Sequence, residues 1–272
     1  MGMKMVLADL PLIAVRSDRG MVRANNEDAV YADPVLGLAI LADGMGGYAA
    51  GEVASMMAVS QLAAAFADLS RRDAISSVRT PDEIVQLMGS EIIAVNSAIY
   101  NLAKTAPQYS GMGTTLVLAW LHGESLHFAH VGDSRLYRWR TGVLAQLTSD
   151  HTLLQAQLDS GMITHEQARL ADYRNLLTRA IGVGPWVAID IGCCDVRSDD
   201  VFLLCSDGLT EMLCDDAIAD LLLAGEDNLE RLAEDLIRRA NDLGGKDNIS
   251  VILMGVGGDR GNWWQRLRAR IA

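Results

Sequence analysis

The sequence predicts an α+β fold in which helices cover antiparallel sheets from the outside. Three observations lead to this prediction. Two long helical segments come early in the chain, a run of short strands joined by tight turns follows them, and a further helix precedes a last strand. Helices and strands that are grouped separately along the chain are typical of α+β folds, and tight hairpins pair strands antiparallel. With 272 residues, half of them hydrophobic, the chain can bury a substantial core.

The first predicted elements are three strands. The first covers Leu12 to Ser17, a polar loop occupies 18–28, and a second strand begins at Ala29 to Tyr31. The apolar run Leu38 to Ala42 (LAILA) then predicts a buried strand. We expect this third strand to stop at Asp43-Gly44, because Asp-Gly marks turns and more glycines follow.

Two helices come next. The segment Ala49 to Leu69 is rich in Ala and Met at helical spacing, which predicts a long helix packed on the sheet. A polar break is expected from Ser70 to Pro81. Residues Asp82 to Lys104 predict a second helix, whose apolar stripe consists of Ile84, Leu87, Met88, Ile92, Val95 and Ile99.

After the helices the sequence changes to short β-rich runs. These are Thr114 to Leu121, Ser125 to Val131 and Arg135 to Arg140, and they are separated by the hairpin signals His122-Gly123-Glu124 and Thr141-Gly142. The regular spacing of strands and turn residues predicts antiparallel pairing of neighbours.

The last part of the chain mixes both kinds of element. A polar helical segment, Asp150 to Arg179, interrupts the strands, and Val201 to Cys205 (VFLLC) predicts a further buried strand. A helix at Asn228 to Leu243 then precedes a final strand at Ile249 to Met254. Since the chain shows no internal repeat or domain boundary, we expect a single domain over residues 1–254.

A Gly-rich linker and a basic tail occupy residues 255–272. The tail carries Trp263 and Trp264 among several arginines on an otherwise acidic protein. It could bind a partner or an anionic membrane surface. We favour the alternative, a terminal helix whose tryptophans pack back on the body.

The net charge, the lengths of the apolar runs and the cysteine spacing limit the classes of function that the protein can have. A formal net charge of -12 argues against a nucleic-acid partner. No apolar run reaches the length of a transmembrane helix, and the N-terminus lacks the pattern of a signal peptide, so we expect a cytoplasmic protein. A monomer is the simplest expectation. The cysteines fit no zinc spacing and are expected to be reduced; they are Cys193, Cys194, Cys205 and Cys214.

Four aspartates share one sequence context. Asp43, Asp133, Asp207 and Asp247 each lie at the end of a predicted strand or in the adjacent turn, so the fold could bring them together at one edge. Carboxylates clustered without Lys or Arg would repel one another, which implies bound cations. Oxygen ligands, including a carbonyl such as that of Gly44, favour Mg²⁺ or Mn²⁺, and two such ions can activate water and polarise a phosphoryl oxygen. The alternative for each aspartate is a turn or cap residue.

Arg23 is the other informative polar residue. It lies in the polar loop four positions before Glu27. A guanidinium there could bind a phosphate through two parallel hydrogen bonds. The alternative is a surface ion pair with Glu27.

Seven short motifs occur in the order known from one enzyme family. On these motifs, which extend from about Leu12 to Met254, the chain resembles the metal-dependent PPM (PP2C-type) protein serine/threonine phosphatases of the compact bacterial kind. The motifs are SDRG…R…NED at 17–28, ADGMGG at 42–47, GMGTT at 111–115, VGDSR at 131–135, LTRAIG at 177–182, LCSDGL at 204–209 and KDNI at 246–249.

The resemblance implies a four-layer αββα sandwich and a role for each matched residue. Asp43 would bridge two Mn²⁺ or Mg²⁺ ions, and the carbonyl of Gly44 would bind one of them. Asp207 and Asp247 would complete the binuclear site, and Asp28 would hold metal-bound water.

The resemblance also implies a third metal and a reaction. Asp133, together with Asp207, would hold a third, weaker metal, and Arg23 would bind the substrate phosphate. A metal-bridging water would attack phosphorus directly, without a phosphoenzyme. The expected partners are phosphoserine and phosphothreonine proteins and the Ser/Thr kinase that the enzyme would oppose.

Two features concern selectivity and proton transfer. Residues of about 150–180 correspond to the family's mobile flap, which is expected to contribute to substrate choice; the alternative is a plain surface helical hairpin.

Tyr48 stands where bacterial members commonly carry a histidine that could protonate the leaving group. His151 and His165 are possible substitutes, although a lone histidine is more often structural.

Two rival functions remain open at this point. One is a catalytically weak phospho-sensor or binding module on the same fold, which the intact acidic set argues against. The other is a phosphatase that acts on an anti-sigma-factor antagonist, which differs in substrate and not in chemistry.

Overall fold

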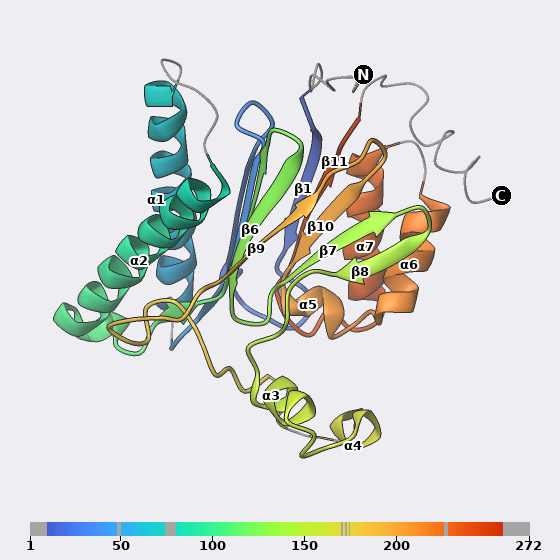
Figure 1. Cartoon of the computed structure of the whole chain (residues 1–272). Helices are drawn as coiled ribbons and strands as arrows, with labels where there is room; N and C mark the ends of the chain where they lie inside the picture. The colour runs from blue at the N-terminus through green and yellow to red at the C-terminus, as the bar shows by residue number, and fades with distance from the viewer. Residues whose placement is uncertain are drawn as a thin grey trace.

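Two antiparallel sheets pack face to face between two layers of helices in the computed structural model, as the αββα prediction requires (Figure 1). The structure describes residues 10–257 except 48–49, 74–79, 170, 172, 174 and 226–227. One sheet has the strand order β1-β11-β10-β7-β8 and the other β2-β3-β5-β6-β9, with the short β4 paired to β3. The strands are β1 Leu12–Asp18, β2 Asp28–Asp33, β3 Leu38–Met45, β4 Gly113–Thr114, β5 Leu116–His122, β6 Ser125–Val131, β7 Arg135–Arg140, β8 Val143–Gln146, β9 Asp190–Asp195, β10 Val201–Cys205 and β11 Ile249–Gly255.

The helices lie on the two outer faces and around one end of the sandwich. In Figure 1, α1 and α2 cover one sheet and α6 and α7 cover the other, while α5 lies at the end of the sheets and α3 and α4 project beyond it. Their bounds are α1 Ala50–Asp73, α2 Pro81–Thr105, α3 Leu153–Asp159, α4 His165–Arg169, α5 Asp207–Thr210, α6 Asp215–Ala224 and α7 Leu229–Asp242, with a 3-10 turn η1 at Pro107–Tyr109.

The apolar residues form three layers of core that match this arrangement. The layer between the two sheets includes Leu41, Val117 and Phe202, all fully buried. A second layer lies under α1 and α2, and a third lies under α6 and α7. The described segment α3–α4 contributes no residue to these three clusters.

Most predicted strands and helices are confirmed within one or two residues. The strands at Ser125–Val131, Arg135–Arg140 and Val201–Cys205 have the expected bounds. The turn at Thr141-Gly142 has positive φ at both residues, 48° and 84°, which matches the twist of a tight hairpin. The N-cap of α2 is a complete capping box between Thr80 and Glu83.

The structure differs from the sequence prediction in several places. β3 continues to Met45 instead of stopping at Asp43-Gly44, because β4 pairs with its last residues. α1 runs to Asp73, through the start of the expected break. The segment Asp150 to Arg179 contains only two short described helices. The elements β8, β9, α5 and α6 had no explicit prediction.

Among the described helices, α1 is the one that is long and apolar enough to cross a membrane by length and composition, over Ala50–Arg71. The sequence analysis expected no such segment. Here α1 packs along β2 and β3, and Ala54, Ala58 and Leu62 are fully buried in the core. The apolar residues of α1 therefore pack in the core of the sandwich. Tyr48 and the tail from residue 258 lie outside the described residues.

Candidate metal centre

The predicted carboxylates come from both sheets and meet at the end of the sandwich where α5 lies. Asp28 and Asp43 are direct neighbours across β2 and β3. Asp207 is the first residue of α5, directly after β10, and Asp247 lies just ahead of β11. Asp133 lies in the connection from β6 to β7. These aspartates are spread over more than 200 residues of the sequence, and strand pairing brings them together.

Glycines allow the backbone segments of this end to approach closely. A Cβ on Gly44 would lie 2.2 Å from the carbonyl oxygen of Gly51 at the start of α1. A Cβ on Gly208 would lie 2.0 Å from the carbonyl oxygen of Asn248. Any side chain at these two positions would push apart the elements that carry Asp43, Asp207 and Asp247.

Asn248 holds the polar loop at 18–28 against the start of β11. Its Nδ2 donates to the carbonyls of Arg19 (2.9 Å) and Asn25 (2.8 Å), and its Oδ1 accepts from the backbone N–H of Glu27 (2.8 Å). Asn248 is 4% exposed, so these backbone groups form their hydrogen bonds with its side chain in place of water. The sequence analysis gave Asn248 no role. Its signals were its place directly after Asp247 and its position in the KDNI motif at 246–249.

Asp28 and Asp43 are held in a buried, like-charged environment. Ser206 Oγ donates to Asp28 Oδ2 (2.9 Å), whereas Asp28 Oδ1 is buried without a hydrogen-bond partner. Burial, and secondarily the charge of Asp247, raises the pKa of Asp28 to about 6. Burial followed by the charges of Asp28 and Asp207 raises the pKa of Asp43 well above its usual value. Burial and the neighbouring like charges therefore disfavour the ionised form of both carboxyls, and a bound cation would favour it.

Asp133 and Asp207 form the second part of the cluster. Burial, then the charges of Asp133 and Glu211, raises the pKa of Asp207 well above its usual value, and its Oδ1 is also buried without a partner. Burial, then the charge of Asp150, raises the pKa of Asp133 to about 6. Arg135 lies nearby, but its guanidinium donates to Asp150 at 2.6 Å and 2.9 Å. The positive charge of Arg135 is therefore largely neutralised by Asp150.

The donor set fits a hard divalent cation. The cluster supplies carboxylate oxygens, two of which are buried and unpaired, in the absence of Cys or His ligands at these positions. Such oxygens are the ligands that Mg²⁺ and Mn²⁺ prefer. The predicted carboxylates do not form a group of three whose ligand atoms all lie within 4.8 Å of one another, as far as the described residues go.

Arg23 reaches the edge of the same cluster. Its Nη2 donates to Asp247 Oδ2 at 2.6 Å, while about half of the side chain is exposed. The alternative expected from sequence, an ion pair with Glu27, is not the contact that forms: Glu27 contributes only its more distant charge. The prediction of a cluster without any basic partner is therefore wrong for Asp247, because the loop at 18–28 folds over it.

A cleft of about 1000 Å³ opens beside the carboxylates. Asp133 and Asp207 line it together with residues of α3, α4 and α5. Apolar residues such as Leu154, Leu158 and Met212 line it together with polar ones. It is large enough for several side chains of a peptide next to a phosphorylated residue.

The two histidines named as possible replacements for the usual histidine are placed differently. His151 is buried, and its Nδ1 accepts from the backbone N–H of Gly132. His165 is the first residue of α4 in the projecting segment. His151 is not a hydrogen-bond partner of the clustered aspartates in the described contacts.

Comparison with known proteins places the chain among phosphatases. A family model described as protein phosphatase 2C matches residues 21–253. The chain is 40% identical over 243 residues to the serine/threonine protein phosphatase PstP of Mycobacterium tuberculosis, which covers 89% of this chain and 44% of PstP. It is 39% identical over 245 residues to the serine/threonine phosphatase stp of Listeria welshimeri, which covers 88% of this chain and 93% of that protein. The chain thus spans less than half the length of the mycobacterial relative.

Solved structures agree with these sequence matches. A crystal structure of the M. tuberculosis phosphatase PstP/Ppp has a TM-score of 0.82 at 38% identity and covers 92% of this chain and 100% of that one. The catalytic domain of PstP in complex with two manganese ions has a TM-score of 0.79 at 38% identity, with 92% and 99% covered.

Proposed function

Because the chain belongs to the protein phosphatase 2C family, we propose that it is a metal-dependent phosphatase that hydrolyses phosphoserine and phosphothreonine in proteins. The observation that carries the proposal is the buried carboxylate cluster with unpaired oxygens on Asp28 and Asp207. Without a cation, burial and mutual repulsion favour protonation of these carboxyls, so a bound divalent ion is what would keep them ionised together.

Five aspartates and one carbonyl would hold the cations. Asp43, the Gly44 carbonyl, Asp207 and Asp247 would hold two Mn²⁺ or Mg²⁺ ions, and Asp28 would orient a bound water. When bound, the ions would lower the pKa of that water and draw negative charge from the phosphoryl oxygens. Asp133 and Asp207 would hold a third, weaker ion. PstP in its two-manganese complex is the precedent among the solved relatives.

The chain's own residues would position the substrate. Arg23 is half exposed at the edge of the cluster, so its guanidinium can turn from Asp247 to the phosphate oxygens of a substrate. Ser206 and Asn248 fix the carboxylates and the loop that carries Arg23. The peptide on either side of the phosphoresidue would lie in the cleft beside the projecting segment at about 150–180, the proposed flap. The enzyme would act in the cytoplasm against a Ser/Thr kinase.

The test is hydrolysis of a phosphothreonine peptide with Mn²⁺, with EDTA, and with the variant Asp207→Asn. We expect turnover that needs Mn²⁺ and falls by at least about 10³-fold in the variant, since the ion loses a charged ligand. The matched control is Asp216→Asn, which removes an exposed carboxylate at the start of α6 and should leave the rate unchanged. Manganese binding without any turnover would instead support the phospho-sensor, and no manganese binding would reject the proposed function.

A further inference from the structure

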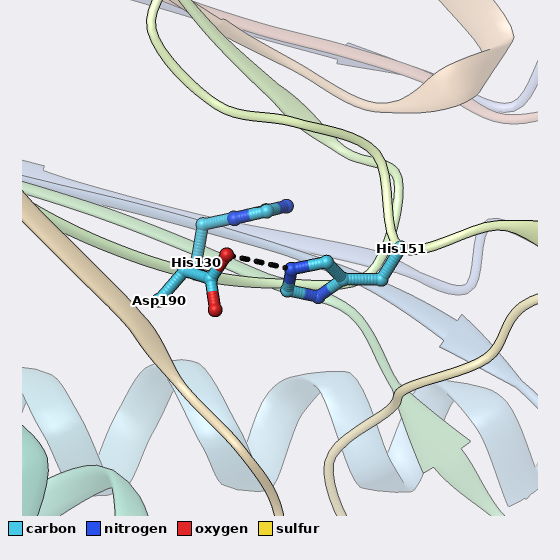
Figure 2. Close-up of side chains that lie close together, drawn as sticks. All are labelled: His130, His151 and Asp190. Carbon is cyan, nitrogen blue, oxygen red and sulfur yellow. Dashed lines mark hydrogen bonds and ion pairs between the residues drawn. The ribbon is translucent and has the colours of Figure 1, made fainter. Parts of the chain in front are cut away.

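A pair of buried histidines lies outside the carboxylate cluster, at the base of the proposed flap. His130 belongs to β6, His151 precedes α3, and their ring centroids are 4.1 Å apart. The two side chains are 1% and 6% exposed. Asp190, at the start of β9, points its carboxylate at Nε2 of His151, 3.2 Å away (Figure 2). We call these three residues the histidine cluster.

The histidine cluster has the composition of a metal site, since its three ligand atoms lie within 4.8 Å of one another. The hydrogen bonds argue against that function. His151 Nδ1 accepts from the N–H of Gly132 (3.1 Å), which leaves the proton on Nε2, facing Asp190. A cation is already present, because Arg179 donates to Asp190 Oδ1 at 2.7 Å. The cluster is therefore complete without a metal ion.

The two histidines fix the peptide groups on both sides of Gly132. His151 accepts from the Gly132 N–H through its side chain, and its backbone N–H donates to the Gly132 carbonyl (2.8 Å). His130 Nε2 lies 3.0 Å from the same carbonyl. Gly132 has φ of +107°, and a Cβ there would lie 2.7 Å from the Thr115 side chain. The backbone that leads into Asp133 is thus held in one conformation.

His151 is also the first residue of the flap's attachment. Its carbonyl accepts from the N–H of Thr178 (2.8 Å), and the next residue, Thr152, forms a β-bridge with Leu177. A third bond joins Leu153 N–H to the Leu176 carbonyl (2.8 Å). The entering and leaving segments of the flap are therefore joined to each other at the residue that holds Gly132.

We propose that His151 is a positioning residue that couples the flap to Asp133. Movement of the flap base changes the Gly132 peptide and with it the Asp133 carboxylate. The inference rests on the proposed function, because it takes Asp133 as a ligand of the weaker cation. Coupling between two sites is reciprocal. A cation at Asp133 thus stabilises the closed flap, and loosening the flap base weakens that cation.

Two substitutions separate the two hydrogen-bonding functions of the His151 imidazole, the contact of Nδ1 with Gly132 and the contact of Nε2 with Asp190. In His151→Asn the side-chain oxygen can take the place of Nδ1 and accept from Gly132, whereas His151→Gln reaches the place of Nε2 and Asp190 but leaves Gly132 without its acceptor. The first measurement is trypsin cleavage after Arg169, inside the flap, in the metal-free protein. The second is Mn²⁺ binding by calorimetry, with the weakest site resolved.

We expect His151→Gln to be cleaved several-fold faster and to bind the weakest Mn²⁺ about tenfold less tightly, as for other residues that orient a metal ligand. The tighter sites should change less than twofold. His151→Asn should restore both quantities toward the wild type. His127→Gln, which removes another buried histidine from β6, should change neither.

Two results would overturn the coupling. One is wild-type cleavage and wild-type weakest-site affinity in His151→Gln, and the other is equal defects in the Asn and Gln variants. If His151→Gln does not fold, Asp190→Asn gives a milder test, because it removes a half-exposed partner of the ring and should shift both readouts in the same direction. The cleavage assay needs no metal and no turnover, so it remains informative even if the phosphatase proposal fails.

Discussion

The carboxylate end of the sandwich and the flap differ in how they are held. Asp28, Asp43 and Asp207 lie on or directly after strands of a core whose central residues are fully buried. The described flap helices add nothing to the three core clusters and are attached mainly through hydrogen bonds at residues 151–153 and 176–178. The site is therefore expected to be rigid and sensitive to charge, and the flap to open at low free-energy cost. The following predictions test that difference.

The largest effect is expected at Asp43. Replacing it in Asp43→Asn should lower kcat by about 10³-fold or more, because the site loses a charged cation ligand. The same change should raise the Tm of the metal-free protein, since it removes a buried, repelling carboxylate. Parallel activity assays and thermal melts in EDTA measure both. A metal-free Tm that falls would show that the carboxylates are not in repulsion.

The next largest effect is expected from Asn248→Ala. This change leaves three backbone groups of the loop at 18–28 without partners in a buried setting, which should cost about 2–4 kcal/mol of unfolding free energy. Urea denaturation measures the loss. As a matched control, Asn101→Ala in α2, away from the loop, should cost less than about 1 kcal/mol. Equal losses in both variants would contradict a special role for Asn248.

Asp28 should give the carboxylate cluster a pH-dependent contribution to stability of its own. The pKa of Asp28 is raised to about 6 in the folded protein, above its ordinary value near 4 in the unfolded chain. Protonated Asp28 is therefore the form that the fold favours, so its contribution is complete below about pH 4 and is lost as the pH rises through about 6.

Thermal melts of metal-free protein from pH 4 to pH 8 check this prediction. The Tm of the wild type should fall relative to that of Asp28→Asn over this range, and saturating Mn²⁺ should remove most of the difference because the cation stabilises the ionised form. A Tm difference that does not change with pH would show that Asp28 ionises normally in the fold.

The smallest effect is expected in the flap. Asn175 donates to Glu211, which closes the flap against the end of α5. In Asn175→Ala we expect the KM for a phosphopeptide to rise two- to fivefold, while kcat/KM for p-nitrophenyl phosphate stays within twofold because that substrate does not reach the flap. Steady-state kinetics on the two substrates measure this. Equal losses on both would mean that the contact supports the metal site itself.

Local patterns were enough to predict much of the fold. The runs at Ser125–Val131 and Val201–Cys205 form strands with the expected bounds, because alternating or continuous apolar residues between turn signals fix a strand locally. The flap was overpredicted as helical, since its amphipathic pattern has no core to pack against. β9, with the sequence DIGCCD, carries only a weak strand pattern and forms by pairing with β6.

The sequence by itself was enough to identify the family and, through that resemblance, the αββα fold, because the motifs depend on residue types at fixed positions along the chain. It also led to the proposed set of acidic site residues. Only the tertiary structure decided that Asp28 lies across from Asp43, that Asn248 holds the loop of Arg23, and that Arg23 contacts Asp247 and not Glu27. Only the tertiary structure also revealed His151 as the link between the flap and Asp133. The physical reason is that these contacts join residues far apart in the sequence, on different strands and loops, so they form only when the strands pair and the loops fold against them.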